Sequence, residues 1–397
     1  MKTIDLFNFR GKKALVRVDF NVPLDKNFVI TDDSRIMAAL PSIEKILSDN
    51  GAVILMSHLG RPENGAEEKY SLKHLMHTIS SALNRPVKFA NDCIGRKTKN
   101  TAKILKNGEV LLLENLRFHS EEKNGDKYFA KQLASLGDIF VNEAFGTAHR
   151  AHASTSVIAD FFENKKCFGY LMANEISMLE KILHHGKHPI TAIMGGAKVS
   201  SKITIIKKLM TKVDRIIIGG GMSYTFVKAL GGKVGDSLVE EDKISLALSL
   251  ISEAKEKKVS FLIPVDSLNA DAFSDQANTY SSDVGNIKDG WMGLDLGEKT
   301  RQIYREAILD SKTILWNGPM GVFEMDRFSN GTKFIAEAIV EATSKGSFSL
   351  VGGGDSVAAL KKFKMQDQVT YVSTGGGAML EYLEGKNIPG IKSINDA

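Results

Sequence analysis

The sequence is poor in cysteine: Cys93 and Cys167 are the only two among its 397 residues. Two cysteines are too few for a disulfide framework, and they lie in no spacing typical of a metal site. We therefore expect a protein of a reducing compartment in which both thiols are inert packing residues.

Long hydrophobic runs are also missing. No apolar segment approaches the roughly 20 residues that a membrane-spanning helix needs. The first dozen residues carry Lys2, Asp5, Arg10 and Lys12, which leaves no apolar core for a signal peptide. These absences predict a cytoplasmic protein without a membrane partner.

A strong charge of either sign is absent as well. Lys and Arg number 52 and Asp and Glu 47, which gives a net charge of +5. This charge is too mild for a dedicated nucleic-acid-binding protein, and no basic segment is interleaved with aromatic residues. It suits anionic metabolites if the cations cluster. The hydrophobic fraction of 43% and the charged fraction of 25% are ordinary for a globular protein, and the length predicts two or three domains.

Two common phosphate-binding patterns, the Walker-type string and the six-position dinucleotide fingerprint, are missing too. Instead, glycine triplets stand between strand-like and helix-like stretches at 219–221, 352–354 and 375–377, and Gly195-Gly196 precedes Lys198 at a fourth such junction. Glycine lets the backbone approach an anion, and the start of the next helix directs N–H groups toward it. Helix packing at a tight turn explains one triplet but explains three poorly, so we interpret the junctions as phosphate-binding.

Apolar strand-like runs alternate with amphipathic helical runs along nearly the whole chain. Because these runs are continuously apolar, they predict parallel sheets covered by helices on both faces. Ligands of such sheets bind at the carboxyl ends of the strands. The predicted strands are Ala14–Val18, Ala52–Met56, Val110–Leu113, Ile139–Val141, Thr191–Met194, Arg215–Ile218, Phe261–Val265, Thr313–Trp316, Phe348–Val351 and Val369–Ser373.

In the first half of the chain, cations and amides follow the strands. They occur in the strings RVDFNVP (17–23), SHLGRP (57–62), LENLRFH (113–119) and GTAHRAH (146–152), and Arg35 lies between the first two. Because strand ends meet at one edge of a parallel sheet, we expect one basic patch suited to phosphate and carboxylate. A single arginine is more often part of a surface ion pair. His149 and His152 lack a third metal ligand, which favours anion contact.

The segment Leu171–Leu183 has apolar residues at helical spacing and predicts a helix that connects two halves. No flexible linker separates the halves, so we expect an α/β protein of two domains, each a mainly parallel sheet flanked by helices (Rossmann-like), facing across a cleft. The expected division is an N-terminal domain at 1–170, a connecting helix at 171–185, a C-terminal domain at 186–380, and a tail at 381–397 that returns to the N-terminal domain.

Eight ordered strings spread over essentially the whole chain resemble phosphoglycerate kinase: RVDFNVP, SHLGRP, LENLRF, FGTAHRAH, GGAKVSSK, WNGPMGVFE, GGGDS and STGGGA. The resemblance implies reversible phosphoryl transfer from 1,3-bisphosphoglycerate to MgADP, giving 3-phosphoglycerate and MgATP in glycolysis and gluconeogenesis. It implies an N-terminal 3-phosphoglycerate domain, a C-terminal nucleotide domain, an Mg²⁺ ion bound with the nucleotide, and direct in-line transfer after domain closure. We also expect a monomer.

The resemblance also implies roles for individual residues. It assigns the substrate contacts to Asp19, Asn21, Arg35, His58, Arg61, Arg117 and Arg150. It assigns the nucleotide contacts to Lys198, Lys202, Gly219, Gly220, Gly221, Gly293, Asn317, Glu324, Gly353, Gly354, Asp355 and Ser356, with Asp355 holding the metal. Phosphoryl transfer depends on positioning and charge neutralisation, so we assign no general base. Arg35 and Lys198 are expected to flank the transferred group, and Gly376 to add an N–H donor.

Some of these assignments have alternatives. Lys198 and Lys202 are one helical turn apart, which predicts that both point at the phosphates from one helix start. A lone aspartate at the position of Asp355 would cap its helix by default, but the family match favours metal binding. Ser201 and Glu143 stand where aspartate is more usual in the family, and Ser356 where threonine is, and none of these departures removes a phosphate cation.

An alternative of a different class is a binding protein that holds anionic ligands without turnover. Nucleic-acid binding is a third possibility, which the near-balanced charge disfavours. Lys198, Asp355 and the expectation of two distinct anion sites favour the enzyme.

Overall fold

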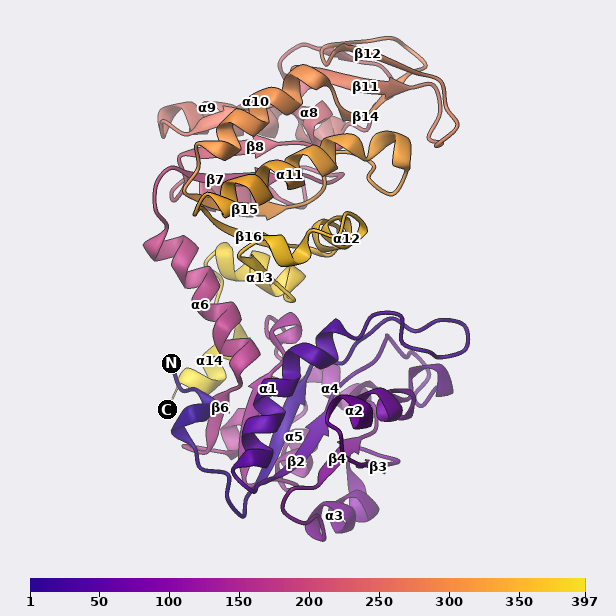
Figure 1. The fold of residues 1–397 in the computed structure, drawn as a ribbon, viewed down its shortest axis with the longest axis vertical. Coiled ribbons are helices and arrows are strands. Elements are labelled where there is room, and N and C mark those ends of the chain that lie inside the picture. Colours follow the sequence, from indigo (N-terminus) through magenta and orange to yellow (C-terminus); the bar gives the residue numbers. More distant parts are fainter. Residues whose placement is uncertain (397) are drawn as a thin grey trace. The chain divides into compact units, whose positions relative to one another are not determined.

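The computed structural model describes residues 1–396. They form two compact units (Figure 1): unit 1 comprises residues 1–177 and the segment that begins at Asn387, and unit 2 comprises Met178–Lys386. Each unit is built on a parallel sheet with flanking helices, which confirms the predicted α/β class. Among residues 1–396, the structure contains no helix that is long and apolar enough to cross a membrane.

The sheet of unit 1 has six strands in the order β3-β4-β2-β1-β5-β6, and all neighbouring strands are parallel. The strands are β1 (Lys13–Val18), β2 (Ala52–Met56), β3 (Val87–Ala90), β4 (Val110–Leu113), β5 (Ile139–Glu143) and β6 (Lys166–Phe168). The helices are α1 (Ser34–Ser48), α2 (Met76–Ala82), α3 (Gly95–Lys103), α4 (Ser120–Asn124), α5 (Lys127–Ala134) and α14 (Pro389–Asn395). The helix α6 (Tyr170–His185) begins in this unit, and among the short 3₁₀ helices η4 (Leu116–Phe118) carries site residues.

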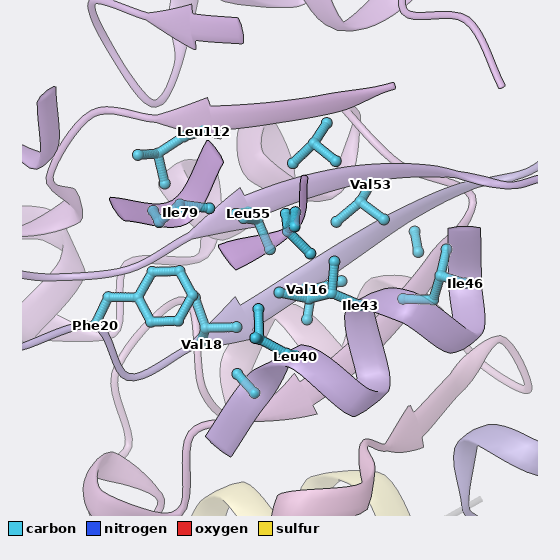
Figure 2. Packing of buried hydrophobic residues seen from close by; sticks show 14 of the residues in the cluster. Val16, Val18, Phe20, Leu40, Ile43, Ile46, Val53, Leu55, Ile79 and Leu112 are labelled. Atoms are coloured by element: carbon cyan, nitrogen blue, oxygen red, sulfur yellow. The ribbon is translucent and has the colours of Figure 1, made fainter. Parts of the chain in front are cut away.

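The core of unit 1 explains why α1 lies against the sheet. Leu40, Ile43 and Ile46 recur every three residues and so share one face of α1. These side chains are buried and belong to the same cluster as Val16 of β1 and Val53 of β2, and Figure 2 shows them between helix and strands. Every residue of β2 is buried, as expected for a strand covered on both faces. This packing fixes the strands whose carboxyl ends carry the charged residues.

The main sheet of unit 2 also has six parallel strands, in the order β10-β8-β7-β15-β16-β17. The strands are β7 (Ile190–Met194), β8 (Arg215–Ile218), β10 (Ser260–Leu262), β15 (Thr313–Asn317), β16 (Phe348–Gly352) and β17 (Tyr371–Val372). The helices are α7 (Ile203–Leu209), α8 (Met222–Ala229), α9 (Ile244–Glu256), α10 (Glu298–Leu309), α11 (Asn330–Ser344), α12 (Gly354–Lys362) and α13 (Gly376–Leu383).

Unit 2 contains two small sheets that the sequence did not predict. β11 (Asp266–Ala270) pairs antiparallel with β12 (Thr279–Asp283) and β14 (Met292–Leu296), and β9 (Lys233–Val234) pairs with β13 (Asn286–Ile287). β9 and β13 have two residues each, β12 alternates exposed and half-buried residues, and the mostly buried β11 and β14 contain polar residues. They therefore lack the continuous apolar runs by which the strands of the main sheets were recognised.

Most predicted strands of the main sheets are confirmed, and β2, β4 and β8 have the predicted ends. The prediction for Phe261–Val265 is wrong in its second half because β10 ends at Leu262. β3 and β6 were not predicted: each is short and contains a lysine, so neither forms a recognisable apolar run. The predicted helix at Leu171–Leu183 is confirmed as α6.

Candidate active site

The residues that follow the strands of unit 1 lie at one edge of its sheet. Arg17 of β1 is level with Met56 of β2 and with Asn142 of β5. Parallel strands in this register end at the same edge, so Asp19 after β1 and His58 after β2 come together there. We call the group formed there by Arg17, Asp19, Asn21, Arg35, His58, Arg61, Arg117, Arg150 and His152 the anion site.

Asp19 organises one side of the anion site. Its Oδ2 atom accepts a hydrogen bond from Arg35 Nη1 at 2.9 Å, and its Oδ1 atom lies 3.7 Å from His58 Nδ1. Arg35 Nη1 also donates to the backbone oxygen of Asn21 at 3.3 Å, while Asn21 Oδ1 accepts from the Gly60 N–H at 2.8 Å. The Arg35 side chain remains 36% exposed, so part of its guanidinium is available to a ligand.

Arg17 is fully buried, and Ser154 connects it to a second carboxylate, Glu122. Arg17 Nε donates to Ser154 Oγ at 2.8 Å, and Ser154 Oγ donates to Glu122 Oε1 at 2.6 Å. Arg17 Nη2 lies 3.3 Å from His58 Nδ1. Burial lowers the pKa of Arg17, and the charges of Glu122 and Asp19 offset part of that effect. Glu122 and Ser154 thus position Arg17 and were not predicted, because no sequence pattern connects them to it.

Arg117 is a second partly desolvated cation of the site. It projects from η4, its Nη1 donates to Gly60 O at 2.9 Å, and its N–H donates to Asn115 Oδ1 at 3.0 Å. Burial lowers its pKa to about 10, and repulsion by Arg17 and Arg150 adds to the shift. Crowded cations repel one another, so an anion that binds among them relieves an unfavourable charge arrangement.

The buried histidines of the site are neutral at pH 7. Burial, followed by the charges of Arg17 and Arg117, lowers the pKa of His58 well below its ordinary value. Burial likewise lowers the pKa of His152 to about 3, with Arg117 and Arg17 contributing. Arginines therefore supply the positive charge, and among them Arg61 and Arg150 are exposed. Arg150 Nε lies 3.2 Å from His149 Nε2.

Three buried atoms of the anion site lack a hydrogen-bond partner among residues 1–396, namely His152 Nδ1, Arg117 Nε, which is a donor, and Asp19 Oδ1, which is an acceptor; the last two bear on the ligand. An unsatisfied buried polar group costs about 1–3 kcal/mol. A small molecule that carries an anionic oxygen and a hydroxyl group would satisfy both, because the oxygen accepts from Arg117 and the hydroxyl donates to Asp19. The arrangement is suited to a hydroxylated anion.

Unit 2 presents glycines and lysines at the corresponding edge of its own sheet. Lys202 Nζ donates to the backbone oxygen of Asn317 at 3.0 Å and also to its Oδ1 atom. Asn317 Nδ2 donates to Gly352 O at 2.8 Å, and Ser356 Oγ accepts from the Gly318 N–H at 2.6 Å. Burial lowers the pKa of Lys202 to about 8, with Asp355 opposing the shift. These bonds join the ends of β15 and β16 to the loop after β7.

Close backbone packing explains several of the glycines. A Cβ atom on Gly195 would lie 2.1 Å from Pro319 O, and one on Gly318 would lie 2.3 Å from Gly195 O. Gly353 has a φ of +96°, and a Cβ atom there would lie 2.5 Å from Asn317 Nδ2. Any larger residue would push these loops apart, so the glycines are needed to keep the strand ends close.

Two cavities open at this edge, both within unit 2. The larger has a volume of about 510 Å³, and its lining includes Gly220, Gly221, Gly293 and Glu324. The smaller has a volume of about 300 Å³ and is lined by Gly196, Ala197, Lys198, Ser201, Lys202, Asn317, Gly318, Gly353, Gly354, Asp355 and Ser356. Gly196, Ala197 and Asp355 line both cavities, so the two adjoin. An apolar chamber beside a lysine-lined one matches a ligand with a planar group and phosphates.

The structure places most predicted nucleotide residues in these cavities, but not all. Gly219 lines neither cavity and instead packs on Met320, because a Cβ atom on Gly219 would lie 2.4 Å from the Sδ atom of Met320. Gly376 begins α13 and also lines neither cavity. Tyr224, Leu238 and Phe273 line the larger cavity and were not predicted, because they come from α8 and from loops that carry no motif.

The prediction that Lys198 and Lys202 lie on one helix start is wrong. α7 begins at Ile203, with Lys202 as its N-cap residue, and Lys198 lies in the preceding loop. The Gly195-Gly196 junction is followed by this irregular loop because the backbone of 195 and 196 is bonded to Asn317 O and Pro319 O. Lys198 is exposed, whereas Lys202 is held by Asn317. The Lys202 ammonium group is therefore fixed by a hydrogen bond, whereas the exposed Lys198 side chain can change its position.

Glu143, one of the departures from the usual family strings, stabilises the start of α6. Its fully buried carboxyl group accepts hydrogen bonds from the N–H groups of Leu171 and Met172, both at 3.0 Å, and from Ser42 Oγ. Burial raises the pKa of Glu143 to about 7, although these hydrogen bonds oppose the shift. The group has no free atom directed at a ligand and is structural.

The raised pKa of Glu143 makes stability depend on pH. The unfolded chain loses this proton near its ordinary pKa of 4.5 and the folded chain near 7, so the free energy of unfolding falls as pH rises between these values. Glutamine does not titrate, so Glu143→Gln should remove up to about 3 kcal/mol of that fall. Urea titrations at about pH 5 and about pH 8 measure it. Glu44→Gln, an exposed change on α1, is the control; equal pH dependence in all three proteins would contradict the expectation.

Comparisons with known proteins agree along the whole chain. The sequence profile of the family "Phosphoglycerate kinase" matches residues 4–386. Phosphoglycerate kinase of Porphyromonas gingivalis is 54% identical over 99% of this chain and 99% of its own, and that of Chloroherpeton thalassium is 50% identical over 100% of this chain and 99% of its own. The structure of phosphoglycerate kinase from Coxiella burnetii has a TM-score of 0.89 and 40% identity, and the match covers 99% of this chain and 98% of that one. The crystal structure of phosphoglycerate kinase from Pyrococcus horikoshii OT3 has a TM-score of 0.82 and 29% identity over the same shares.

Proposed function

The chain belongs to the phosphoglycerate kinase family and catalyses reversible phosphoryl transfer between 1,3-bisphosphoglycerate and ADP, and we propose that its two units divide this reaction between their sites. In this proposal 3-phosphoglycerate binds in the anion site of unit 1, and the nucleotide binds in the two cavities of unit 2. The supporting observation is that each unit gathers candidate anion ligands at one edge of its sheet, arginines in unit 1 and glycines with lysines in unit 2.

The chemistry of the anion site suits 3-phosphoglycerate, which carries a phosphate, a carboxylate and a hydroxyl group. We assign the phosphate and carboxylate to the arginines, because a guanidinium fork binds such groups with two parallel hydrogen bonds. The hydroxyl group is assigned to Asp19, whose Oδ1 atom is otherwise without a donor among residues 1–396. Asn21, His58, Arg61 and Arg150 complete the proposed contacts.

In unit 2 we assign the base and ribose of the nucleotide to the larger cavity and the phosphates to the smaller one. Gly220, Gly221 and Gly293 line the larger cavity, and we assign the ribose hydroxyls to the exposed carboxylate of Glu324, which also lines it. Lys198, Lys202 and the backbone N–H groups at the start of α12 suit phosphate oxygens. Gly219 is assigned no contact with the nucleotide, because it packs against Met320, a residue that lines the larger cavity.

A direct assay tests the activity. Purified protein is incubated with 3-phosphoglycerate and MgATP, and NADH oxidation is followed through glyceraldehyde-3-phosphate dehydrogenase. We expect a rate proportional to protein concentration. A rate no greater than that of a protein-free control would contradict the activity and favour an anion-binding protein without turnover.

The residues present also fit Mg²⁺ beside the nucleotide. Asp355 lies in the first turn of α12, lines both cavities, and offers a carboxylate that no hydrogen bond within residues 1–396 engages. The N-cap residue of α12 is Gly353, so Asp355 does not cap the helix by that position. Mg²⁺ prefers carboxylate and phosphate oxygens, and when bound it supplies neutralisation of phosphate charge.

Asp355→Asn should separate metal binding from a structural role. The amide is a poorer Mg²⁺ ligand of the same size, so the Mg²⁺ concentration that gives half the maximal rate should rise at least about tenfold. The melting temperature should stay the same. Asp289→Asn, an exposed change elsewhere in unit 2, is the control. An unchanged Mg²⁺ requirement with a lowered melting temperature would instead assign Asp355 to the fold.

We propose in-line transfer without a general base, because the attacking oxygen is already ionised. Arg35 of unit 1 and Lys198 of unit 2 would neutralise the moving group, and the N–H groups at Gly376 would add donors. Neither unit carries both cations, and in open water their effect would be weak while hydrolysis competes. The proposal therefore requires the units to close on the bound ligands.

Closure can be measured by small-angle scattering. We expect the smallest radius of gyration with 3-phosphoglycerate and MgADP both at saturation, because each ligand contributes part of the free energy of closing. The protein alone and the two single-ligand complexes serve as references. A radius that is the same in all four samples would count against closure as the step that assembles the site.

A further inference from the structure

A group of three potential metal ligands in unit 1 has no role in the proposed reaction. Asp92 and Cys93 lie in the turn between β3 and α3, and His119 follows η4. One ligand atom from each side chain lies within 4.8 Å of the others. The sequence did not reveal the group, because Asp92 and Cys93 are far along the chain from His119 and match no metal-binding spacing. The fold brings them together.

Neighbouring bonds hold two of the three side chains in place. His119 Nε2 lies 2.8 Å from Asp92 Oδ1, which also accepts the Cys93 N–H at 2.7 Å. The His119 ring packs against Phe129, with the ring centroids 5.3 Å apart. Asp92 Oδ2 accepts no hydrogen bond within residues 1–396, so a carboxylate oxygen remains available next to the thiol and the imidazole. The ligands are therefore largely preorganised.

The depth of the group suits an ion that keeps a water ligand. Cys93 is fully buried, whereas the Asp92 and His119 side chains are 51% and 26% exposed. An ion between them would have sulfur on the protein side and solvent on the other side. In a tetrahedral zinc site the bonds are about 2.0–2.3 Å long, so ligand atoms lie roughly 3.3–3.8 Å apart. The present separations, all within 4.8 Å, need small side-chain rotations.

The local charge favours a cation. Three carboxylates, Asp92, Glu122 and Glu114, act electrostatically on the Cys93 thiol. Asp92 and Glu121 likewise place negative charge near the His119 ring. A divalent cation relieves this negative field, and on binding it displaces the thiol proton to solvent.

We propose that Asp92, Cys93 and His119 form a binding site for a divalent transition metal of the Zn²⁺ class, with water completing the coordination. One sulfur, one imidazole nitrogen and one carboxylate oxygen are typical ligands of Zn²⁺, whereas Mg²⁺ prefers oxygen alone. The site is separate from the Mg²⁺ position proposed at Asp355, and the inference does not depend on the kinase activity.

Cobalt substitution tests the proposal on the full chain kept in reductant. Co²⁺ added to metal-free protein should give tetrahedral d–d bands and a sulfur-to-cobalt charge-transfer band, which saturate at one ion per chain. Added Zn²⁺ should abolish both, and excess Mg²⁺ should leave them unchanged. The charge-transfer band should disappear in Cys93→Ala and persist in Cys167→Ala, whose thiol is equally buried but outside the group.

Two further variants keep the test valid if Cys93→Ala fails to fold. His119→Gln and Asp92→Asn change partly exposed side chains, and each should weaken Zn²⁺ binding at least about tenfold. His185→Gln removes an exposed histidine at the end of α6 and should leave the affinity unchanged. The proposal is overturned if no charge-transfer band forms. It is equally overturned if His185→Gln weakens binding while His119→Gln does not, since the metal would then be bound adventitiously at the surface.

Discussion

Replacing Arg35 with alanine is expected to lower kcat by roughly 10³–10⁵-fold, the range seen when an arginine that stabilises phosphoryl-transfer charge is removed. Arg35 is held by Asp19 at 2.9 Å, yet its side chain stays 36% exposed, so one face of the guanidinium is free for the moving group. Its ion pair is partly solvated and contributes no more than about 1 kcal/mol to stability. The loss should therefore appear in rate rather than in folding.

The coupled NADH assay measures this effect, with the melting temperature determined in parallel. Arg35→Lys tests the planar fork, because it keeps the charge and loses the paired donors. Arg10→Ala, an exposed change outside the anion site, is the matched control and should be fully active. If Arg35→Ala keeps more than a tenth of wild-type kcat, the loss is below ~1.4 kcal/mol and Arg35 is not a catalytic residue.

The second large effect is expected at Lys198. Lys198→Met should lower kcat by roughly 10²–10³-fold, as for removal of one preorganised group that stabilises developing charge. Lys198 is exposed in a loop beside the smaller cavity, and no ion pair or hydrogen bond engages its ammonium group within residues 1–396. An unengaged cation can follow the transferred group. The KM for MgATP should change much less than kcat.

Lys202→Met is the informative comparison for Lys198→Met. Lys202 is held by Asn317 and its pKa is lowered to about 8 by burial, so its loss should raise the KM for nucleotide and lower the melting temperature. Lys207→Met, on the exposed face of α7, should change neither parameter. If Lys198→Met and Lys202→Met change kcat and KM in the same proportion, the two lysines do not have the different roles that we expect.

Local patterns predicted the main architecture well. The apolar runs at 52–56, 110–113 and 215–218 became strands with the predicted ends, because a strand covered on both faces needs continuous apolar residues. The small sheets of unit 2 escaped prediction, since their stability comes from packing against other elements rather than from their own composition. Tertiary contacts also decided the local structure around Lys198. The N–H groups of Gly195 and Gly196 donate to Asn317 O and Pro319 O, so an irregular loop forms where a helix start was expected.

The functional sites were also predicted only in part from the sequence. The arginines and glycines that follow strands could be predicted, because the rule that parallel strands end at one edge needs only the order of elements. Their partners could not: Glu122 reaches Arg17 through Ser154, and Ser154 is 137 residues from Arg17 in the sequence. Each such contact depends on the path of the chain between distant residues, for which no local pattern exists.

The sequence by itself therefore determined the two parallel sheets, the family, and the residues available at the sheet edges, because these follow from apolar periodicity and from short ordered strings. Only the tertiary structure decided how those residues act. It buried Arg17, left Arg35 and Lys202 half-buried and Lys198 exposed, and brought His119 beside Asp92 and Cys93. Burial and proximity depend on packing between distant segments. Burial shifts the pKa values of the site residues, and proximity decides which side chains can bind one ligand together.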